Sequence, residues 1–276
     1  MSAKAAKIIL ISLFLFLLSY TCFARSKTII LATTTSVEDS GLLDVLMQAF
    51  KDKTGLTVKA IAVGTGQAIK LGENGEADIL WVHSPQDEEK FILDGYGINR
   101  TTFLHNDFVI LGPKNDPAKV ATAKNAGEAF KKIAAAEQLF ISRGDNSGTH
   151  KKEKKLWEKS GAAPDKNAYI EVGQGMAQTA MVANEKQAYT LCDRSTYLSL
   201  KKTFNLGIVF AGSPDLINRY SLILVNPDRF PKVNAVGGRA LFDFLLSSES
   251  KNIIENFGRE KFGQQLFYPD ARKPRP

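Results

Sequence analysis

Residues 28–53 read TIILATTTSVEDSGLLDVLMQAFKDK, and this stretch decides the fold. It opens with a short run of Ile and Leu, 28–32, of the kind that forms a buried strand. It closes with a stretch, 40–53, in which Leu, Met and Phe recur at helical spacing and make one apolar stripe. Four consecutive hydroxyl residues, 33–36, separate the two parts. The stretch therefore predicts a strand, a polar turn and an amphipathic helix.

The same alternation continues along the chain. Short runs rich in Ile, Val, Leu and Phe predict strands at 57–63, 78–82, 107–111, 138–142, 169–172, 189–192, 207–210 and 220–225. Amphipathic stretches predict helices at 85–93, 126–137, 149–159, 176–186 and 240–246. Alternation of this kind predicts an α/β protein with mixed, mostly parallel sheets flanked by helices.

Two Gly/Pro-rich breaks divide the chain, at 111–117 and 211–215. The first directly follows a predicted strand and the second directly precedes one. Breaks that bracket roughly 100 residues are typical of an inserted lobe reached by two crossover segments. We therefore expect one discontinuous lobe made of 25–112 and 214–276, and a second lobe made of 113–213. The alternative is two ordinary loops in one larger sheet.

The first 24 residues have the layout of a secretory signal peptide. Lys4 and Lys7 precede an uncharged apolar run that is too short to span a membrane, and we expect cleavage after Ala24. Cys22 offers an alternative, a lipid-anchored cysteine, but bulky Tyr20 stands where lipoprotein signals have small residues. The prediction is export to the periplasm, with no membrane-spanning run in the mature chain. Cleavage would leave a single cysteine and so no internal disulfide.

The formal net charge is +7. A basic balance can indicate nucleic acid, an anionic surface or small anions as partners. Nucleic acid is not expected outside the cytoplasm, and the lysine-rich run 151–155 has no interleaved aromatic residue. Its ordinary interpretation is a solvated helix face.

Three segments place hydroxyl residues and glycines where a predicted strand ends and a helix begins: 32–37, 63–67 and 141–150. A helix N-terminus presents unpaired N–H groups and a partial positive charge, so it favours anions. Arg143 is the only full positive charge close to these turns, and its planar fork suits oxyanions. One such turn is usually only an N-cap, but three of them together predict an anion site.

Other motifs fail on inspection. Ile69 stands where a dinucleotide-binding fingerprint after Gly64 needs its third glycine, and the phosphate-binding loop of NTPases is also incomplete there. The three histidines are scattered, and no ligand cluster has metal spacing. No Gly-x-Ser-x-Gly elbow occurs. We expect neither an enzyme nor a metal site.

Four blocks in order carry a family resemblance: 32–36, 77–85, 142–150 and 189–198. They are similar to the tungstate-binding subunits of Tup-type ABC importers. Phosphate-binding subunits share the Arg…Ser-Gly-Thr turn only in outline. The resemblance implies the type II periplasmic binding protein fold, with two α/β lobes, a two-strand hinge and one anion in the cleft between the lobes. It also implies a monomer, no cofactor, and a permease with its ATPase as partner.

The resemblance also suggests the ligand-binding residues. Thr35, Ser36 and Thr65 would present donors from the first lobe, with His83 as a further donor. From the second lobe, the donors would be Arg143, Ser147, Gly148 and Thr149.

Position 83 bears on the choice of anion. Phosphate binders that resemble this chain carry an Asp in the corresponding stretch, which can accept the proton of hydrogen phosphate. Tungstate and molybdate are unprotonated dianions near neutral pH, and a histidine can donate to them. We therefore expect tungstate or molybdate, with sulfate and phosphate as alternatives.

Two rivals come from other functional classes. An exported hydrolase of phosphate or sulfate esters would use Ser36 or Thr35 as nucleophile and His83 or His150 as base. An adhesion module would use the tripeptide 143–145, Arg-Gly-Asp.

Overall fold

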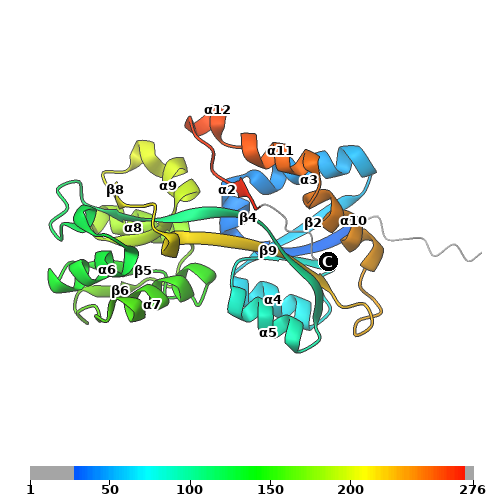
Figure 1. The fold of residues 1–276 in the computed structure, drawn as a ribbon, viewed down its shortest axis with the longest axis horizontal. Coiled ribbons are helices and arrows are strands. Elements are labelled where there is room, and N and C mark those ends of the chain that lie inside the picture. Colours follow the sequence, from blue (N-terminus) through cyan, green and yellow to red (C-terminus); the bar gives the residue numbers. More distant parts are fainter. Residues whose placement is uncertain (1–27, 271–276) are drawn as a thin grey trace, which may run out of the picture.

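A computed structural model describes residues 28–270 of the chain. The predicted signal peptide, its cleavage after Ala24 and the alternative role of Cys22 lie outside these residues. Figure 1 shows two groups of helices and strands side by side, joined by two strands that run from one group to the other. No helix among residues 28–270 is long and apolar enough to cross a membrane.

The first group contains a mixed sheet with strand order β10-β4-β9-β3-β1-β2. Its strands are β1 (Thr28–Thr34), β2 (Thr57–Val63), β3 (Ile79–Val82), β10 (Tyr268–Pro269) and parts of β4 (Gly97–Gly112) and β9 (Ile217–Val225). Its helices are α2 (Thr35–Ser40), α3 (Leu42–Thr54), α4 (Thr65–Glu73), α5 (Pro85–Leu93), α10 (Ala235–Leu245), α11 (Ser248–Asn256) and α12 (Arg259–Phe262). Helices cover both faces of this sheet (Figure 1).

The second group is built on the far end of β4 and on a small parallel pair. Its further strands are β5 (Phe140–Ser142), β6 (Tyr169–Glu171), β7 (Thr190–Asp193) and β8 (Gly207–Phe210). Its helices are α6 (Ala126–Ala135), α7 (Gly148–Ser160), α8 (Met176–Lys186) and α9 (Arg194–Leu200), and short 3₁₀ turns lie at Val120–Thr122, Lys201–Thr203 and Pro214–Leu216.

Strands β4 and β9 connect the two groups. β4 pairs with β9 from Gly97 to Asp107, and from Phe108 onward it pairs with β7 and β8 instead. The last β4–β9 pair is Asp107 with Ile217. Both strands therefore pass between the groups close to residues 107 and 217.

Alternating side chains of single strands build separate cores on the two faces of each sheet. In β1, Ile29 and Leu31 pack with α3 and α10, whereas Ala32 packs with α4 and α5. In β5, Phe140 packs with α6 and α7, whereas Ile141 packs with α8 and α9. Each fully buried aliphatic or aromatic side chain contributes about 1.5–3 kcal/mol. Four apolar clusters thus stabilise two separate three-layer units.

The fold class is confirmed as α/β with mixed sheets and flanking helices. The predicted elements recur with small shifts at their ends, and 57–63, 85–93, 176–186 and 207–210 coincide with β2, α5, α8 and β8. The sheets are less parallel than expected, because β4 and β9 pair antiparallel with their neighbours. The prediction also missed the first part of β4, where four consecutive polar residues, 99–102, interrupt the apolar pattern.

Candidate ligand-binding site

The first group contributes hydroxyl side chains from the starts of α2 and α4. The Oγ1 of Thr34 lies 3.1 Å from the Oγ of Ser36, and both side chains are buried. Thr65 is the first residue of α4; it is fully buried, and its Oγ1 has no hydrogen-bond partner among residues 28–270. Thr35 is only partly buried, and no hydrogen bond of its side chain is found within that range.

The second group contributes the loop between β5 and α7. The guanidinium of Arg143 donates to Asp145 Oδ2 from Nη2 at 2.6 Å and from Nε at 3.1 Å. Asp145 Oδ1 accepts the backbone N–H of Ser147 at 3.1 Å, and the Ser147 hydroxyl caps α7. Gly144 has a φ of +63°, and a Cβ there would lie 2.6 Å from Glu171 Cβ, so only glycine fits this tight loop. Arg143 is 5% exposed, so the loop holds its charge inside the protein.

Gly148 and Thr149 follow as the first residues of α7. Thr149 is 2% exposed, and its Oγ1 is a second buried hydroxyl without a partner in the described part of the chain. Buried hydroxyls are normally hydrogen-bonded, and leaving one unpaired costs about 1–3 kcal/mol. Thr65 and Thr149 can therefore each donate to an acceptor outside the described part of the chain.

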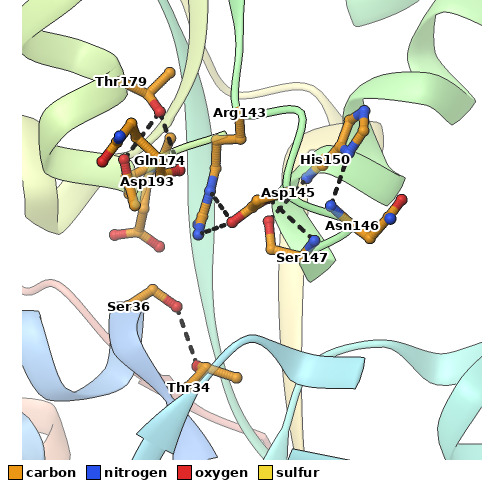
Figure 2. Close-up of polar contacts among 12 residues, drawn as sticks. Thr34, Ser36, Arg143, Asp145, Asn146, Ser147, His150, Gln174, Thr179 and Asp193 are labelled. Atoms are coloured by element: carbon orange, nitrogen blue, oxygen red, sulfur yellow. Dashed lines mark hydrogen bonds and ion pairs between the residues drawn. The ribbon is translucent and has the colours of Figure 1, made fainter. Parts of the chain in front are cut away.

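The two groups face each other at this place. Figure 2 shows the Arg143 side chain directed from its loop toward Ser36 and Thr34 on the opposite side. The charge of Arg143 reaches the first group, since it opposes the burial that raises the pKa of Asp39 in α2. An ideal Cβ on Gly148 would lie 2.9 Å from His83 Cε1, so these residues of different groups touch. Of the predicted residues, Ser36 and His83 of the first group thus lie opposite Arg143 and Gly148 of the second.

His83 follows β3 and is buried between the groups. Its Nδ1 lies 2.9 Å from Asn218 Oδ1, and its ring packs on Tyr220 with ring centroids 4.9 Å apart. Burial, reinforced by the positive charge of Arg143, lowers the pKa of His83 to about 4, although the bond to Asn218 opposes this shift. The imidazole is therefore neutral at neutral pH.

A chain of hydrogen bonds fixes the proton of that imidazole. The carboxylate of Asp193 can only accept, and it accepts Asn106 Nδ2 at 2.5 Å. Asn106 Oδ1 then accepts Asn218 Nδ2 at 2.9 Å, and the same Nδ2 donates to Tyr220 Oη at 2.9 Å. Asn218 Oδ1 is left for His83, so His83 Nδ1 donates. Its Nε2 then carries a lone pair and cannot donate to an anion, which argues against the donor role predicted for His83.

The sequence prediction missed Asp145, Asp193, Asn106, Asn218 and Tyr220. The two acids stand inside the blocks 142–150 and 189–198, but no ligand-supporting role was predicted for them. The two asparagines lie next to other polar residues on β4 and β9, and they pair with each other where these strands cross between the groups. Because polar residues adjoin both asparagines, no local sequence signal set them apart.

Residues 28–270 do not show the geometry that an ester hydrolase or an adhesion module would need. No hydrogen bond joins a histidine to Ser36 or Thr35 in the described range, and His150 Nδ1 accepts the Asn146 N–H at 3.0 Å. Arg143 of the Arg-Gly-Asp tripeptide is buried and bonded to Asp145, so it is not presented to a receptor. No group of three or more His, Cys, Asp or Glu side chains suited to a metal ion occurs among residues 28–270.

A comparison with family models decides the family. The PBP superfamily domain matches residues 23–249. The chain belongs to the PBP superfamily. This PBP chain is 46% identical over 248 residues to the tungstate-binding protein TupA of Peptoclostridium acidaminophilum, covering 89% of this chain and 87% of that protein.

Two solved structures agree with this assignment. The tungstate ABC transporter protein of Geobacter sulfurreducens is 48% identical, with a TM-score of 0.78 over 83% of this chain and 98% of that one. The tungstate-binding protein TupA of Desulfovibrio alaskensis is 41% identical, with a TM-score of 0.79 over 89% of this chain and 99% of that one. The resemblance inferred from the four sequence blocks is confirmed. These PBP relatives are described as binding or transport proteins rather than enzymes, as expected for this chain.

Proposed function

We propose that this chain captures tungstate, or the closely similar molybdate, between its two lobes and delivers it in the periplasm to the permease of an ABC importer with its ATPase. The names of the similar proteins support tungstate and an ABC transporter. The ligand-binding residues would be Thr35, Ser36, Thr65, Arg143, Ser147, Gly148 and Thr149, with His83 as a packing neighbour. The chain would act as a monomer.

The two lobes would be the discontinuous unit 25–112 with 214–276 and the inserted unit 113–213. The strand pairing favours moving each boundary by a few residues, to 107/108 and 216/217, because β4 changes partners there. Leu216 supports this shift, since it packs in the core of the second group. The hinge would then consist of the paired segments around Asn106 and Asn218.

One observation carries the proposal: two buried hydroxyls, Thr65 Oγ1 and Thr149 Oγ1, have no hydrogen-bond partner among the described residues and stand at helix starts in different groups. Each hydrogen bond to a charged ligand contributes about 1.5–3 kcal/mol. About six to eight of them supply roughly 9–24 kcal/mol before the costs of closure and ordering, and nanomolar binding needs about 12 kcal/mol. Hydroxyl and amide donors with one guanidinium are therefore sufficient for tight binding.

Calorimetry with tungstate, molybdate, sulfate and phosphate tests the choice of ligand. We expect tungstate and molybdate to bind far more tightly than the other two anions. Phosphate binding at least as tight as tungstate binding would contradict the substrate assignment. If none of the four anions binds, oxyanion binding itself is contradicted.

Isosteric variants test the site itself. In Thr65→Val and Thr149→Val we expect weaker tungstate binding without loss of stability of the free protein, because neither hydroxyl has a protein partner. The matched control is Thr190→Val, whose buried Oγ1 donates to the Ile141 carbonyl at 2.8 Å. That variant should lose stability and keep its affinity. Equal affinity losses in all three would show that the effect is not specific to the site.

A further inference from the structure

A second cavity, of about 160 Å³, lies beside the candidate ligand-binding site. Its inner wall includes His83, Gly148 and Asn218, and its outer wall carries the basic side chains of Lys151, Lys152, Lys155 and Arg219. We call it the basic pocket. None of Ser36, Thr65, Arg143 or Thr149 lines it. Gly148 lines the basic pocket and is also one of the proposed ligand-binding residues, so the two sites adjoin there.

The charges around the basic pocket are not balanced. Lys151 is paired with Asp87, at 2.5 Å. Lys152, Lys155 and Arg219 form no ion pair with any residue between 28 and 270. Burial is the largest cause that lowers the pKa of Lys152; Asp215 opposes this shift, and the weaker effects of Lys155, Arg219 and Lys159 add to it. Three cations that crowd one cavity repel each other, and a bound anion would remove that cost.

The walls of the basic pocket come from both groups. Ser84 and Pro85 precede α5 in the first group, the lysines stand on α7 in the second, and Ile217–Arg219 belong to the crossing strand β9. An anion held here would contact all three and would favour the arrangement in which the groups are together. The 13-residue helix α7 also directs its N-terminal end, at Gly148, to the pocket's inner wall.

We propose that the basic pocket is a second oxyanion site, which takes an inorganic dianion such as sulfate or hydrogen phosphate and stabilises the closed arrangement of the lobes. Its occupancy then strengthens retention of the ligand in the main site, because both anions favour the same arrangement. Only this coupling rests on the proposed function; the second site itself does not.

The test uses thermal unfolding of the full chain with sulfate as the probe, at ionic strength kept constant with sodium chloride. The protein is first saturated with tungstate, so that sulfate cannot act through the main site. We expect sulfate to raise the Tm further, with a rise that grows with the logarithm of its concentration. The double variant K155Q/R219Q should lose this rise and keep tungstate binding in the absence of sulfate.

The matched control is K131Q/K166Q, which removes the same charge at two exposed lysines without ion pairs elsewhere on the second group. It should respond to sulfate like the wild type. An equal sulfate response in wild type and K155Q/R219Q would overturn the proposal, and so would a wild type that does not respond. If tungstate itself does not raise the Tm, the proposed function fails. The comparison of wild type with K155Q/R219Q in sulfate alone then still decides the second site.

Discussion

The contact between Gly148 and His83 gives a sharp prediction, because it joins the two lobes and leaves no room for a side chain. A Cβ on Gly148 would lie 2.9 Å from His83 Cε1 and 3.2 Å from each ring nitrogen. His83 cannot retreat, since Asn218 holds its Nδ1 and Tyr220 covers its ring. Overpacking of this kind costs about 1–3 kcal/mol. When the lobes move apart, the added methyl group no longer clashes with His83. The clash therefore destabilises the closed arrangement and not the open one.

We therefore expect Gly148→Ala to weaken tungstate binding about 5- to 150-fold, at tenfold per 1.4 kcal/mol. The free protein should be no less stable, because alanine is a better helix residue than glycine at the start of α7. Calorimetry on G148A, H83A and G148A/H83A measures the effect as a double-mutant cycle. In the H83A background the methyl group has room, so the penalty should largely vanish. The same penalty in both backgrounds, or no penalty in either, would refute the reasoning.

Three further predictions follow from the site and its support. Arg143→Ala should remove most of the oxyanion affinity measured by calorimetry while leaving the fold intact, and unchanged affinity would exclude this arginine as a ligand residue. In Asn218→Asp the new carboxylate cannot donate to Asn106 and Tyr220. This variant should therefore weaken tungstate binding about tenfold or more, at about 1.4 kcal/mol per tenfold. The control Asn226→Asp, whose side chain bonds elsewhere, should keep its tungstate affinity. Burial raises the pKa of Glu153 to about 7, so ionisation costs the folded state up to about 3 kcal/mol as the pH rises from 4.5 to 7. The stability of Glu153→Gln relative to wild type should therefore increase over that range in urea unfolding, and a constant difference would contradict the shift.

Much of the fold could be predicted because its strands and helices have strong local patterns. β2, α5, α8 and β8 each have a continuous apolar run or stripe with clear ends, and the prediction matched their bounds. The first half of β4 failed because its residues 99–102 are polar and lie partly exposed, so neither alternation nor a buried run appears. Short α2 and α9 failed for another reason. Each has fewer than two turns, and packing against each other across the two groups holds them in place.

In the candidate site, too, the sequence predicted the local features but not the contacts between distant residues. The turns at 33–36, 64–66 and 143–149 could be predicted, since their hydroxyls and glycines act where the sequence places them, at helix starts. What could not be predicted was which polar groups are already bonded within the protein. Asp145 Oδ2 accepts hydrogen bonds from two nitrogens of Arg143, and Asn218 Oδ1 accepts a hydrogen bond from His83 Nδ1. The His83–Asn218 pair joins residues 135 positions apart, so no local pattern contains it, whereas the Arg143–Asp145 pair is local and was overlooked.

These pairings change the argument about protonated and unprotonated anions. The sequence-based argument relied on the absence of an acid at position 83, but the partly buried Asp145 and the buried Asp193 lie in or beside the site. Asp145 Oδ2 is bonded to Arg143 and its Oδ1 to the Ser147 N–H, while Asp193 accepts Asn106 and Ser195. Both acids are thus engaged by donors of the protein, whereas the hydroxyls of Thr65 and Thr149 are unengaged and can donate. Free hydroxyl donors suit a fully deprotonated dianion, and apart from the lone pair of His83 Nε2 these residues leave no unengaged acceptor for the proton of hydrogen phosphate.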